Sequence, residues 1–465
     1  MERTYIKDLK EHIGKEVTIS GWVDVRRDQG KMVFLDLRDM SGKVQAVVLP
    51  NHTEALEVAQ RLRPEWVVSV SAQVNKRPER NIKADVLNGD IELEVLNIEV
   101  LNGAETPTFD VSSDGREIGE EVRLKYRYLD LRRPRMQHNF RMRHEVLLHL
   151  RNFYASHGFM EIETPSLTKS TPEGSRDYVV PSRIDQGKFY ALPQSPQQYK
   201  QLLMASGFER YVQVARCFRD EDTRGDRQPE FTQIDMEMSF VTQEDVMQIN
   251  EALIIDMVTK LYPEKRIQQV PFPRISYKDA MEKYGNDKPD IREDKEDTNL
   301  LAFCWVVDFP FFEKTDTGAW TFSHNPFSAP KPEFMSDLME EKNIGGIVAA
   351  QYDMALNGYE IGGGGIRNHN PEALKKVLKI MGHTDEGIEK NFGHMLKALA
   401  AGAPPHGGLA FGFDRLMMIL QNEPNIREVI AFAKTGEGRD PMMESPSEIS
   451  AEQLQELGIT IPKRK

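Results

Sequence analysis

Between residues 212 and 240 the chain reads as a strand, a long charged loop and a second strand that returns beside the first. Side chains of the second strand alternate, with apolar Ile234, Met236, Met238 and Phe240 on one face and polar Gln233, Asp235 and Glu237 on the other. A period of two is typical of a half-buried strand, and burial of the apolar face fixes the register. The polar residues must therefore share one surface, although an ordinary hairpin with a solvated loop has the same pattern.

Residues 1–104 contain short alternating runs separated by turn signals, which predict a small barrel. In chain order the runs are strands that begin near Val17, Met32 and Lys43, a helix over 53–62, and strands over 66–75 and 91–101. Four or five strands with a helix between the third and fourth is the arrangement of an OB-fold barrel. Such barrels bind single-stranded nucleic acid by stacking bases on aromatic side chains. Phe34 is a candidate for stacking, although a lone phenylalanine in a strand is more often part of the core.

The rest of the chain predicts a second, larger domain of the α+β class. Residues 105–134 break the periodicity and read as a hinge or linker, so we place this domain at 135–465. A long helix with Val146 and Leu150 at helical spacing ends at Gly158. The later strands come as hairpins and not as βαβ units, which indicates an antiparallel β-sheet flanked by helices.

The strongest hairpin signal is the pair Asn357-Gly358. Folding about this turn places Ala355 opposite Glu360, so that Asp353 lies diagonal to Glu360 on the same face. Two neighbouring carboxylates are unfavourable unless a cation joins them. A hard divalent cation such as magnesium is the natural candidate. The four glycines that follow remove side chains where a ligand could approach the backbone.

Composition limits the compartment and the partners. The chain has 465 residues, of which 39% are hydrophobic and 29% charged, as in an ordinary globular protein of two domains or more. We expect a cytoplasmic protein, because there is no long apolar run or apolar N-terminal signal segment and Cys217 and Cys304 are the only cysteines. The net charge of −13 argues against indiscriminate nucleic-acid binding. Residues 116–151 nevertheless carry a local excess of Arg and Lys, which a solvated linker would also show.

Three segments resemble the signature motifs of class II aminoacyl-tRNA synthetases. They are EIETP (161–165) for motif 1, FRDE (218–221) with RQPEFTQ (227–233) for motif 2, and GGLAFGFDRL (407–416) for motif 3. The resemblance implies that Arg219 binds the α-phosphate of ATP and the amino-acid carboxylate, and that motif 1 forms a homodimer interface. A planar guanidinium suits this role, because it can neutralise two anions through parallel donors.

Arg415, at the start of the motif 3 helix, implies a second phosphate contact. An arginine there is disfavoured by the helix dipole, which makes an anionic partner plausible, although a plain ion pair would also explain it. The resemblance makes Arg219 and Arg415 the catalytic residues.

Further strings are similar to those of bacterial-type aspartyl-tRNA synthetases, and this resemblance covers nearly the whole chain. They include TPEGSRDY (171–178), LPQSPQQYKQ (192–201), SHNPF (323–327) and NGYEIGGGGIR (357–367). Lys200, Arg367 and His324 are potential cations, as expected for a pocket that receives a carboxylate side chain.

The resemblance implies the following site residues. The aspartate site would comprise Glu173, Ser195, Gln197, Lys200, Arg219, Asp235, His324 and Arg367. The ATP site would comprise Arg219, Asp220, Glu221, Gln228, Glu360, Gly412, Phe413, Asp414 and Arg415, with Asp353 and Glu360 at the magnesium ion. The tRNA anticodon would meet Arg27, Gln29, Phe34, Gln45 and Glu92.

The implied activity is that of an aspartate–tRNA ligase. Aspartate would attack the α-phosphate of ATP to give aspartyl-adenylate and pyrophosphate, and the 3′ end of tRNA(Asp) would then take the aspartyl group. The cofactors would be ATP and Mg²⁺. An asparagine-type synthetase and a catalytically silent tRNA-binding paralogue remain as alternatives, and the presence of Arg219, Asp353, Glu360 and Arg415 argues against the second.

Two departures from the bacterial pattern stand out. Only nine residues, 291–299, lie where bacterial members usually carry a large inserted domain. Asn325 stands where a second histidine often follows His324. Together with Gln29 in the barrel, Asn325 leaves open whether tRNA(Asn) is also charged.

Overall fold

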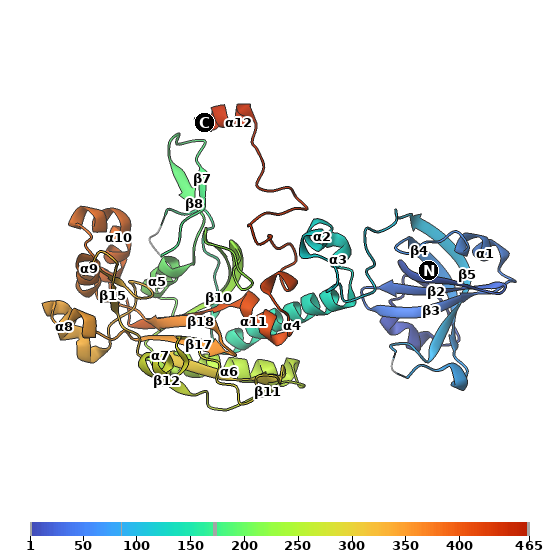
Figure 1. Ribbon diagram of the computed structural model, residues 1–465, viewed down its shortest axis with the longest axis horizontal. Coiled ribbons are helices and arrows are strands. Elements are labelled where there is room, and N and C mark those ends of the chain that lie inside the picture. The colour runs from blue at the N-terminus through green and yellow to red at the C-terminus, as the bar shows by residue number, and fades with distance from the viewer. Residues whose placement is uncertain (1, 85, 171–173, 463–465) are drawn as a thin grey trace. The chain divides into compact units, whose positions relative to one another are not determined.

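The computed structural model describes residues 2–84, 86–170 and 174–462 and divides into two compact units, Met1–Glu117 and Ile118–Lys465 (Figure 1). The division falls inside the segment 105–134 that we expected to be a linker. Its second half is no linker, because residues 118–134 fold with the larger unit. Nothing in the local sequence indicates this, since the contacts that hold α2 and α3 come from residues about 300 positions away.

The first unit is a closed barrel with the strand order β1-β2-β3-β5-β4, which confirms the predicted OB-fold. Its elements are the 3₁₀ helices η1 (Ile6–His12) and η2 (Glu79–Asn81), strands β1 (Glu16–Gln29), β2 (Met32–Asp39), β3 (Gly42–Val48), β4 (Val67–Lys76) and β5 (Ile91–Asn102), and helix α1 (Thr53–Ala59). Alternate residues such as Val33, Leu35 and Leu37 point into one apolar core. Their neighbours in sequence therefore face outward.

The larger unit is built on an eight-stranded sheet with the order β12-β14-β17-β18-β19-β10-β9-β6. The strands are β6 (Met160–Glu161), β9 (Arg210–Phe218), β10 (Glu230–Ser239), β12 (Arg274–Ser276), β14 (Phe303–Val307), β17 (Gln351–Leu356), β18 (Tyr359–Ile366) and β19 (His406–Gly412). All neighbours are antiparallel except at the two ends, where β6 runs parallel to β9 and β12 parallel to β14. The expected antiparallel sheet is thus confirmed, with two parallel edge strands added.

Helices α4, α6 and α11 pack on one face of this sheet, and the site lies on the other face, where α5 forms part of its wall (Figure 1). The apolar side chains of β10 (Ile234, Met236 and Met238) form one core with α4, α6 and α11. The helices of the unit are α2 (Glu120–Lys125), α3 (Arg127–Asp130), α4 (Pro134–Ser156), α5 (Gln197–Ala205), α6 (Gln243–Leu261), α7 (Tyr277–Tyr284), α8 (Met335–Glu340), α9 (Pro371–Ile380), α10 (Asp385–Ala400), α11 (Phe413–Leu420) and α12 (Ala451–Leu457). The polar residues of β10 therefore face the opposite side.

The predicted alternation of β10 is present, but the strand is buried on both faces and not half-buried. Phe240 lies beyond its end, exposed and with a φ of 59°. Three small two-stranded sheets complete the unit. They pair β7 (Val179–Pro181) with β8 (Phe189–Ala191), β11 (Arg266–Ile267) with β13 (Leu300–Leu301), and β15 (Phe312–Lys314) with β16 (Trp320–Phe322).

Arginines of residues 118–143 are tied into the unit by buried ion pairs. Arg123 pairs with Glu428 at 2.7 Å and Arg135 with Glu423 at 2.7 Å, while Asp130 accepts from both Arg127 and Arg133 at 2.7 Å. Much of the basic stretch noted in the sequence is therefore internal structure. In the described ranges no helix is long and apolar enough to cross a membrane.

Candidate active site

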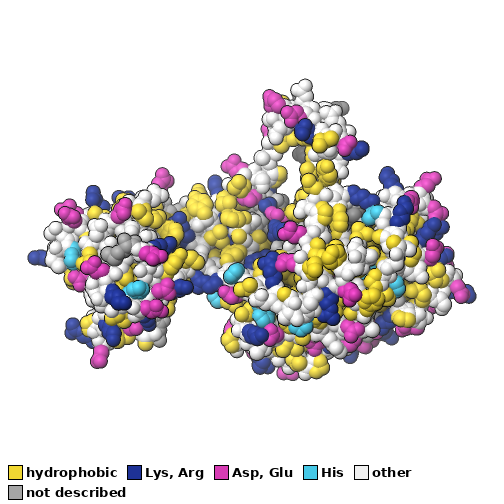
Figure 2. All heavy atoms as spheres, turned by 180° about the vertical axis from the view of Figure 1, so that it is seen from behind, with side chains coloured by type: hydrophobic (Ala, Val, Ile, Leu, Met, Phe, Trp, Pro, Cys, Tyr) yellow, Lys and Arg dark blue, Asp and Glu magenta, His cyan; other side chains and the backbone are white. Residues whose placement is uncertain are grey.

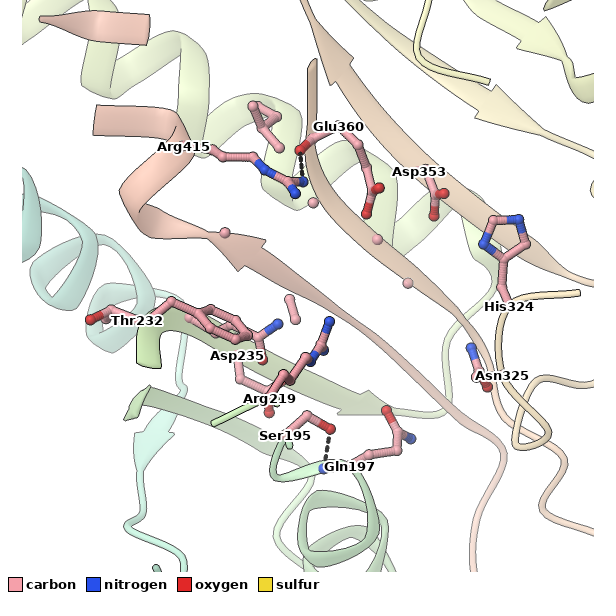
Figure 3. A pocket seen from close by; sticks show the side chains of 18 of the residues that line it. Ser195, Gln197, Arg219, Thr232, Asp235, His324, Asn325, Asp353, Glu360 and Arg415 are labelled. Atoms are coloured by element: carbon pink, nitrogen blue, oxygen red, sulfur yellow. Dashed lines mark hydrogen bonds between the residues drawn. The ribbon is translucent and has the colours of Figure 1, made fainter. Parts of the chain in front are cut away.

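A cavity of about 380 Å³ opens on the polar face of β10. Its walls come from β10, from the loop that follows β9, from the hairpin of β17 and β18, from β19, and from the starts of α5 and α11. Figure 3 shows Arg219 and Gln197 on one side of this space and Asp353 and Glu360 on the other. Arg415 lies toward one end and His324 toward the other, so the sequence motifs converge on one hollow.

At the amino-acid end of the cavity, four charged side chains are buried together. Lys200 Nζ lies 2.6 Å from Asp235 Oδ1 and 3.2 Å from Glu237 Oε2. Arg367 donates through Nε and Nη2 to the two oxygens of Glu237, at 2.9 and 3.2 Å. We expected Lys200 and Arg367 to be free for a substrate carboxylate. Each in fact already has a carboxylate partner from β10.

The pKa values of the two carboxylates move in opposite directions. Burial raises the pKa of Asp235, with Lys200 acting against it. Burial would also raise the pKa of Glu237, but Arg367 and Lys200 outweigh it and the pKa is lowered. Asp235 Oδ2 is buried and receives no hydrogen bond from any described residue. This oxygen is a ready acceptor for an ammonium group.

Gly408 explains how Glu237 fits beneath β19. A Cβ at Gly408 would lie 2.0 Å from Glu237 Oε2 and 2.2 Å from the backbone oxygen of Met236. No side chain is possible there unless the strands separate. Glycine at this position is thus required by the buried carboxylate beside it.

The hairpin of β17 and β18 turns at Asn357-Gly358, both with positive φ, and pairs Ala355 with Glu360 as predicted. A register shift between Met354 and Ala355 places Asp353 opposite Gly363, and not in the regular diagonal position. The two carboxylates still lie side by side (Figure 3). Burial and the charge of Glu360 raise the pKa of Asp353 well above its ordinary value.

This carboxylate pair fits a cation that brings further ligands of its own. A raised pKa is what two unneutralised neighbouring carboxylates produce, and a divalent ion would relieve it. No group of three or more His, Cys, Asp and Glu side chains that could hold a metal occurs in the part of the chain that the structure describes. Phosphate oxygens would have to complete the coordination.

Arg219, the residue after β9, differs from the other cations of the cavity. Its guanidinium stands over the ring of Phe231, 5.1 Å from the centroid, and its Nε lies 3.4 Å from the carbonyl oxygen of Gln194. Within the described ranges no carboxylate forms an ion pair with it. Arg219 is therefore positioned by an aromatic face and keeps its charge available for an anionic ligand.

Arg415 is held at the start of α11 by two partners. Its Nη1 donates to the carbonyl oxygen of Glu360 at 2.8 Å, and its Nε lies 3.2 Å from Asp226 Oδ2 (Figure 3). The plain ion pair considered for Arg415 is thus present, with Asp226. Its side chain still lines the cavity.

Asp414 differs from the expectation that it binds ATP. Its Oδ1 accepts from Arg143 Nη1 at 2.7 Å, and its Oδ2 accepts from the backbone nitrogen of Thr232 at 2.8 Å. Both oxygens are engaged, so this buried carboxylate fastens α11 to α4 and β10. It positions the neighbouring Arg415.

Two predicted site residues, Phe413 and Asp220, do not line the cavity. Phe413 is fully buried in the hydrophobic core, because the helix period turns it away from the site. Asp220 lies outside the lining and pairs with the exposed Arg176 at 3.5 Å. Glu173 falls outside the described residues. The predicted residues that do line the cavity are Ser195, Gln197, Lys200, Arg219, Glu221, Gln228, Asp235, His324, Asp353, Glu360, Arg367, Gly412, Asp414 and Arg415.

His324 is not the cation that we expected. Burial lowers its pKa, although the charge of Glu360 acts in the other direction. Its ring packs edge-on against Phe309 at 4.6 Å between centroids. At neutral pH the imidazole of His324 is therefore a neutral hydrogen-bonding group.

The neighbouring Asn325 is held in place by its backbone contacts. Its Oδ1 accepts from the backbone nitrogens of Phe327 and Ser328, at 3.0 and 3.1 Å.

Sequence reasoning missed three residues of consequence. Glu237 was placed on the polar face of β10 but received no role, although that alternation was the available signal. Phe231, which supports Arg219, and Asp226, which holds Arg415, had no local signal. The partner of Asp226, Arg415, is distant in sequence, and the partner of Phe231, Arg219, lies in the irregular loop between β9 and β10.

The predicted anticodon residues share the outer face of the barrel. Arg27, Phe34, Gln45 and Glu92 come from β1, β2, β3 and β5, which are consecutive strands of the barrel. Phe34 is partly exposed and outside the core, so its core interpretation is wrong. Gln29 is exposed at the end of β1. Arg27 donates to both oxygens of Asp36 at 2.8 Å, and Gln45 accepts from Arg77 at 2.9 Å.

Comparison with known families places both units. A family model described as tRNA synthetases class II (D, K and N) matches residues 119–436, and one described as OB-fold nucleic acid binding domain matches residues 17–101. Among solved structures, the asparaginyl-tRNA synthetase of Pyrococcus horikoshii complexed with asparaginyl-adenylate has a TM-score of 0.76 at 25% identity, covering 94% of this chain and 98% of that one.

Curated relatives match over almost the full length. The aspartate–tRNA(Asp/Asn) ligase of Rubrobacter xylanophilus is 39% identical over 574 aligned positions, covering 97% of this chain and 95% of that protein. The aspartate–tRNA ligase of Listeria monocytogenes is 39% identical over 590 positions, covering 99% of each. Both alignments are longer than the 465 residues of this chain, so both relatives carry residues without a counterpart here. With these matches over both units, the chain belongs to the class II (D, K and N) family of tRNA synthetases.

Proposed function

We propose that this chain is an aspartate–tRNA ligase that forms aspartyl-adenylate from aspartate and ATP and transfers the aspartyl group to tRNA(Asp). The observation that supports it most is the buried cluster of Lys200, Arg367, Asp235 and Glu237. Two buried cations flank the place where a substrate side chain would enter, and Asp235 offers a free oxygen for the ammonium group. The full-length relatives named aspartate–tRNA ligase point the same way.

The two substrates would meet at Arg219. In the first step a carboxylate oxygen attacks the α-phosphorus of ATP and pyrophosphate leaves. Both reactants are anions, and the unpaired guanidinium of Arg219 can donate to both. Catalysis then consists of positioning and charge stabilisation, with no covalent enzyme intermediate. A magnesium ion between Asp353 and Glu360 would neutralise phosphate charge when bound.

The two arginines at the cavity would have separate duties. Arg415, anchored through Asp226 and the carbonyl of Glu360, would face the terminal phosphate. Arg219, backed by Phe231, would stay at the reacting phosphate. Gln228 has a buried amide nitrogen with no partner among the described groups, which makes it a donor to the nucleotide.

The remaining partners follow from the same assignment. The outer face of the barrel would bind the anticodon, with Phe34 as the stacking platform. The motif 1 segment, which includes β6 and follows α4, would form a homodimer interface. Buried Cys217 and Cys304 form no disulfide, in keeping with a reducing cytoplasmic compartment.

A second candidate is charging of both tRNA(Asp) and tRNA(Asn). Curated relatives of equal similarity include a ligase named for both tRNAs and one named for aspartate alone. Gln29 at the barrel rim and Asn325 at the cavity are the departures that bear on this choice.

Pyrophosphate exchange tests the activity directly. Labelled pyrophosphate should enter ATP when aspartate is added and should not when asparagine replaces it. Exchange with asparagine alone would support an asparagine-type enzyme, and no exchange with either would support a silent tRNA-binding protein. Charging of purified tRNA(Asp) and tRNA(Asn) transcripts then separates the two forms of specificity.

A further inference from the structure

A second cavity, of about 560 Å³, lies on the other side of α5. Gln197 and Lys200 of this helix line the first cavity, whereas Gln198, Tyr199 and Leu202 line the second. These sets occupy opposite faces, because successive residues of an α-helix are about 100° apart. Ser195, just before the helix, lines both. The second cavity is therefore separate from the site of the proposed reaction.

Flat apolar side chains dominate the walls of the second cavity. Phe189 and Tyr190 of β8 contribute to one wall, and Tyr199 and Leu202 of α5 to another. Phe189 and Tyr190 are exposed, and apolar side chains continue from the mouth along the hairpin (Figure 2). The volume is in the range of pockets that hold a small organic molecule. A planar aromatic body fits such walls.

A polar group with an unmet hydrogen bond lies at the inner end. Gln198 is only 5% exposed, and its Nε2 has no hydrogen-bond partner among the described residues. Its Oε1 is already 2.7 Å from Nε2 of His394. An unpaired buried amide is costly, so a ligand that accepts from it gains that free energy.

A positive charge stands at the mouth. Lys169 is exposed and its Nζ contacts only the carbonyl oxygen of Lys390, at 3.3 Å, while no carboxylate of the described ranges pairs with it. Burial lowers the pKa of His394, and the charge of Lys169 lowers it further, so the imidazole is neutral at neutral pH. The free positive charge at this end thus belongs to the lysine.

We propose that this cavity binds a planar aromatic carboxylate with a hydroxyl or carbonyl oxygen at its far end. The ring would lie between Tyr190 and Leu202, the far oxygen would accept from Gln198, and the carboxylate would meet Lys169. This binding does not depend on the proposed function. A ligand seated there would touch the helix that also carries Gln197 and Lys200.

The probe for the test is 6-hydroxy-2-naphthoate, which has both polar ends. Two control compounds can each make fewer contacts, because 2-naphthoate lacks the hydroxyl and 2-naphthol lacks the carboxylate. Calorimetric titration of the full-length protein should show that the complete probe binds most tightly. Saturating ATP and aspartate should not displace it. Displacement by either substrate would place the probe in the first cavity and overturn the proposal.

Substitutions locate the site. Lys169→Ala should weaken both naphthoates by about fivefold, the size of one exposed charge pair, and leave 2-naphthol unchanged. Leu202→Trp should fill the cavity and abolish binding of all three compounds. Lys375→Ala, on α9 and outside the lining, is the matched control and should change nothing. Absence of binding to the unaltered protein, or equal binding to Leu202→Trp with an unchanged melting curve, would refute the proposal.

Discussion

Arg219 combines an available positive charge with a fixed position, and the two properties have different sources. The charge is available because no described carboxylate pairs with it, and the position is fixed by the ring of Phe231. Lys200 and Arg367 are the opposite case, since Asp235 and Glu237 neutralise them before any substrate arrives. A substrate carboxylate must therefore compete for those two cations but not for Arg219.

Arg219→Ala should abolish aspartate-dependent pyrophosphate exchange while the protein stays folded. Losing one preorganised donor at a developing charge costs about 3 to 4 kcal/mol of transition-state stabilisation. Initial rates of exchange and a thermal melt check both parts. Arg216→Ala on β9 is the control, because Arg216 pairs at 2.8 Å with Glu230, which does not line the cavity. Exchange near the unaltered rate in folded Arg219→Ala protein would remove Arg219 from the mechanism.

Phe34→Ala should separate the two units by function. Stacking of a base on an aromatic ring is worth about 1 to 3 kcal/mol, so aminoacylation of tRNA(Asp) should fall by roughly tenfold or more. Exchange should be unchanged, because the adenylate forms in the other unit. The melting curve should also hold, since Phe34 is not in the barrel core. Full charging by this variant would exclude an anticodon role, and an earlier melt would restore a structural one.

At the residue scale, sequence reasoning succeeded where a regular period applied. The alternation of β10 correctly placed Asp235, because strand geometry alone decides the face. It failed where pairing is long-range. Arg367 and Glu237 are 130 positions apart, and nothing near either residue shows that they neutralise each other. Phe413 was assigned to the site as part of a motif, whereas the helix turns it into the core.

Two elements of the larger unit, α4 and α11, are joined by charged side chains. Arg143 of α4 donates to Asp414 at 2.7 Å and to the hydroxyl of Thr232 at 3.2 Å, and it stacks over Phe413 at 4.6 Å. Arg415 is the next residue after Asp414. The long helix thus holds the arginine that we assign to the terminal phosphate.

Arg143→Ala should raise the KM for ATP with a smaller effect on the KM for aspartate. The reason is that Asp414 loses its partner and α11 is free to shift, which displaces Arg415. Removing one partner of a buried pair also costs stability, about 3 to 5 kcal/mol, so a melt must accompany the kinetics. Arg143→Lys keeps the charge and should restore part of the ATP affinity. Equal losses for both substrates, at unchanged stability, would contradict this positioning role.

The ion pairs of Glu428 make the stability of the larger unit depend on pH. Burial would raise its pKa, but the hydrogen bonds and charges of Arg123 and Arg135 lower it to about 2. A carboxyl with a lowered folded-state pKa adds stability above its unfolded pKa, and that stability is lost as the pH falls through the folded value. For this group the difference amounts to about 3 kcal/mol, lost progressively between roughly pH 5 and pH 2.

Glu428→Gln should therefore lower the unfolding free energy of the larger unit at pH 7, and the gap to the unaltered protein should close as the pH approaches 2. Urea unfolding followed at several pH values measures this. Glu437→Gln, at an exposed position, is the control. A gap that does not depend on pH would mean that the glutamate stabilises through packing and not through its charge.

Element positions were predicted well where the pattern was strong. The barrel helix, the end of α4 near Gly158 and the turn at Asn357-Gly358 all occur where the sequence indicated. Residues 118–134 were misread because α2 and α3 are short and charged, and their stability comes from pairs with residues near 428. An extra residue in β18, Ile361, also escaped prediction, since the bulge that it makes is set by the neighbouring strands.

The whole molecule has a short, anchored segment at 291–299, the place where we expected bacterial members to carry an extra domain. Glu293 donates its backbone nitrogen to Gln268 at 2.9 Å, and Asp297 pairs with Arg266 at 3.3 Å. These contacts hold the segment between α7 and β13 against the rest of the unit without a further domain. None of the cavity residues comes from this segment.

Inserting ten Gly and Ser residues between Lys295 and Glu296 should leave exchange unchanged and lower the melting temperature only slightly. Loop-closure entropy grows slowly, by about 0.6 kcal/mol for each doubling of length. Exchange rates and thermal melts of the two proteins provide the comparison. A large loss of exchange would show that the segment supports the cavity although none of its residues lines it.

The ion pair between α4 and Asp414 also bears on how the activity of this protein would depend on its concentration. If the motif 1 segment that follows α4 meets a second copy of the chain, as we propose, then mass action governs the placement of Arg415. In a cell that holds the enzyme at a concentration well above the dissociation constant of the dimer, Arg415 would be in place in every chain. Below it, single chains would stay folded through their own cores yet bind ATP less well. Concentration would then act as an adjustable input to catalysis, transmitted along one helix.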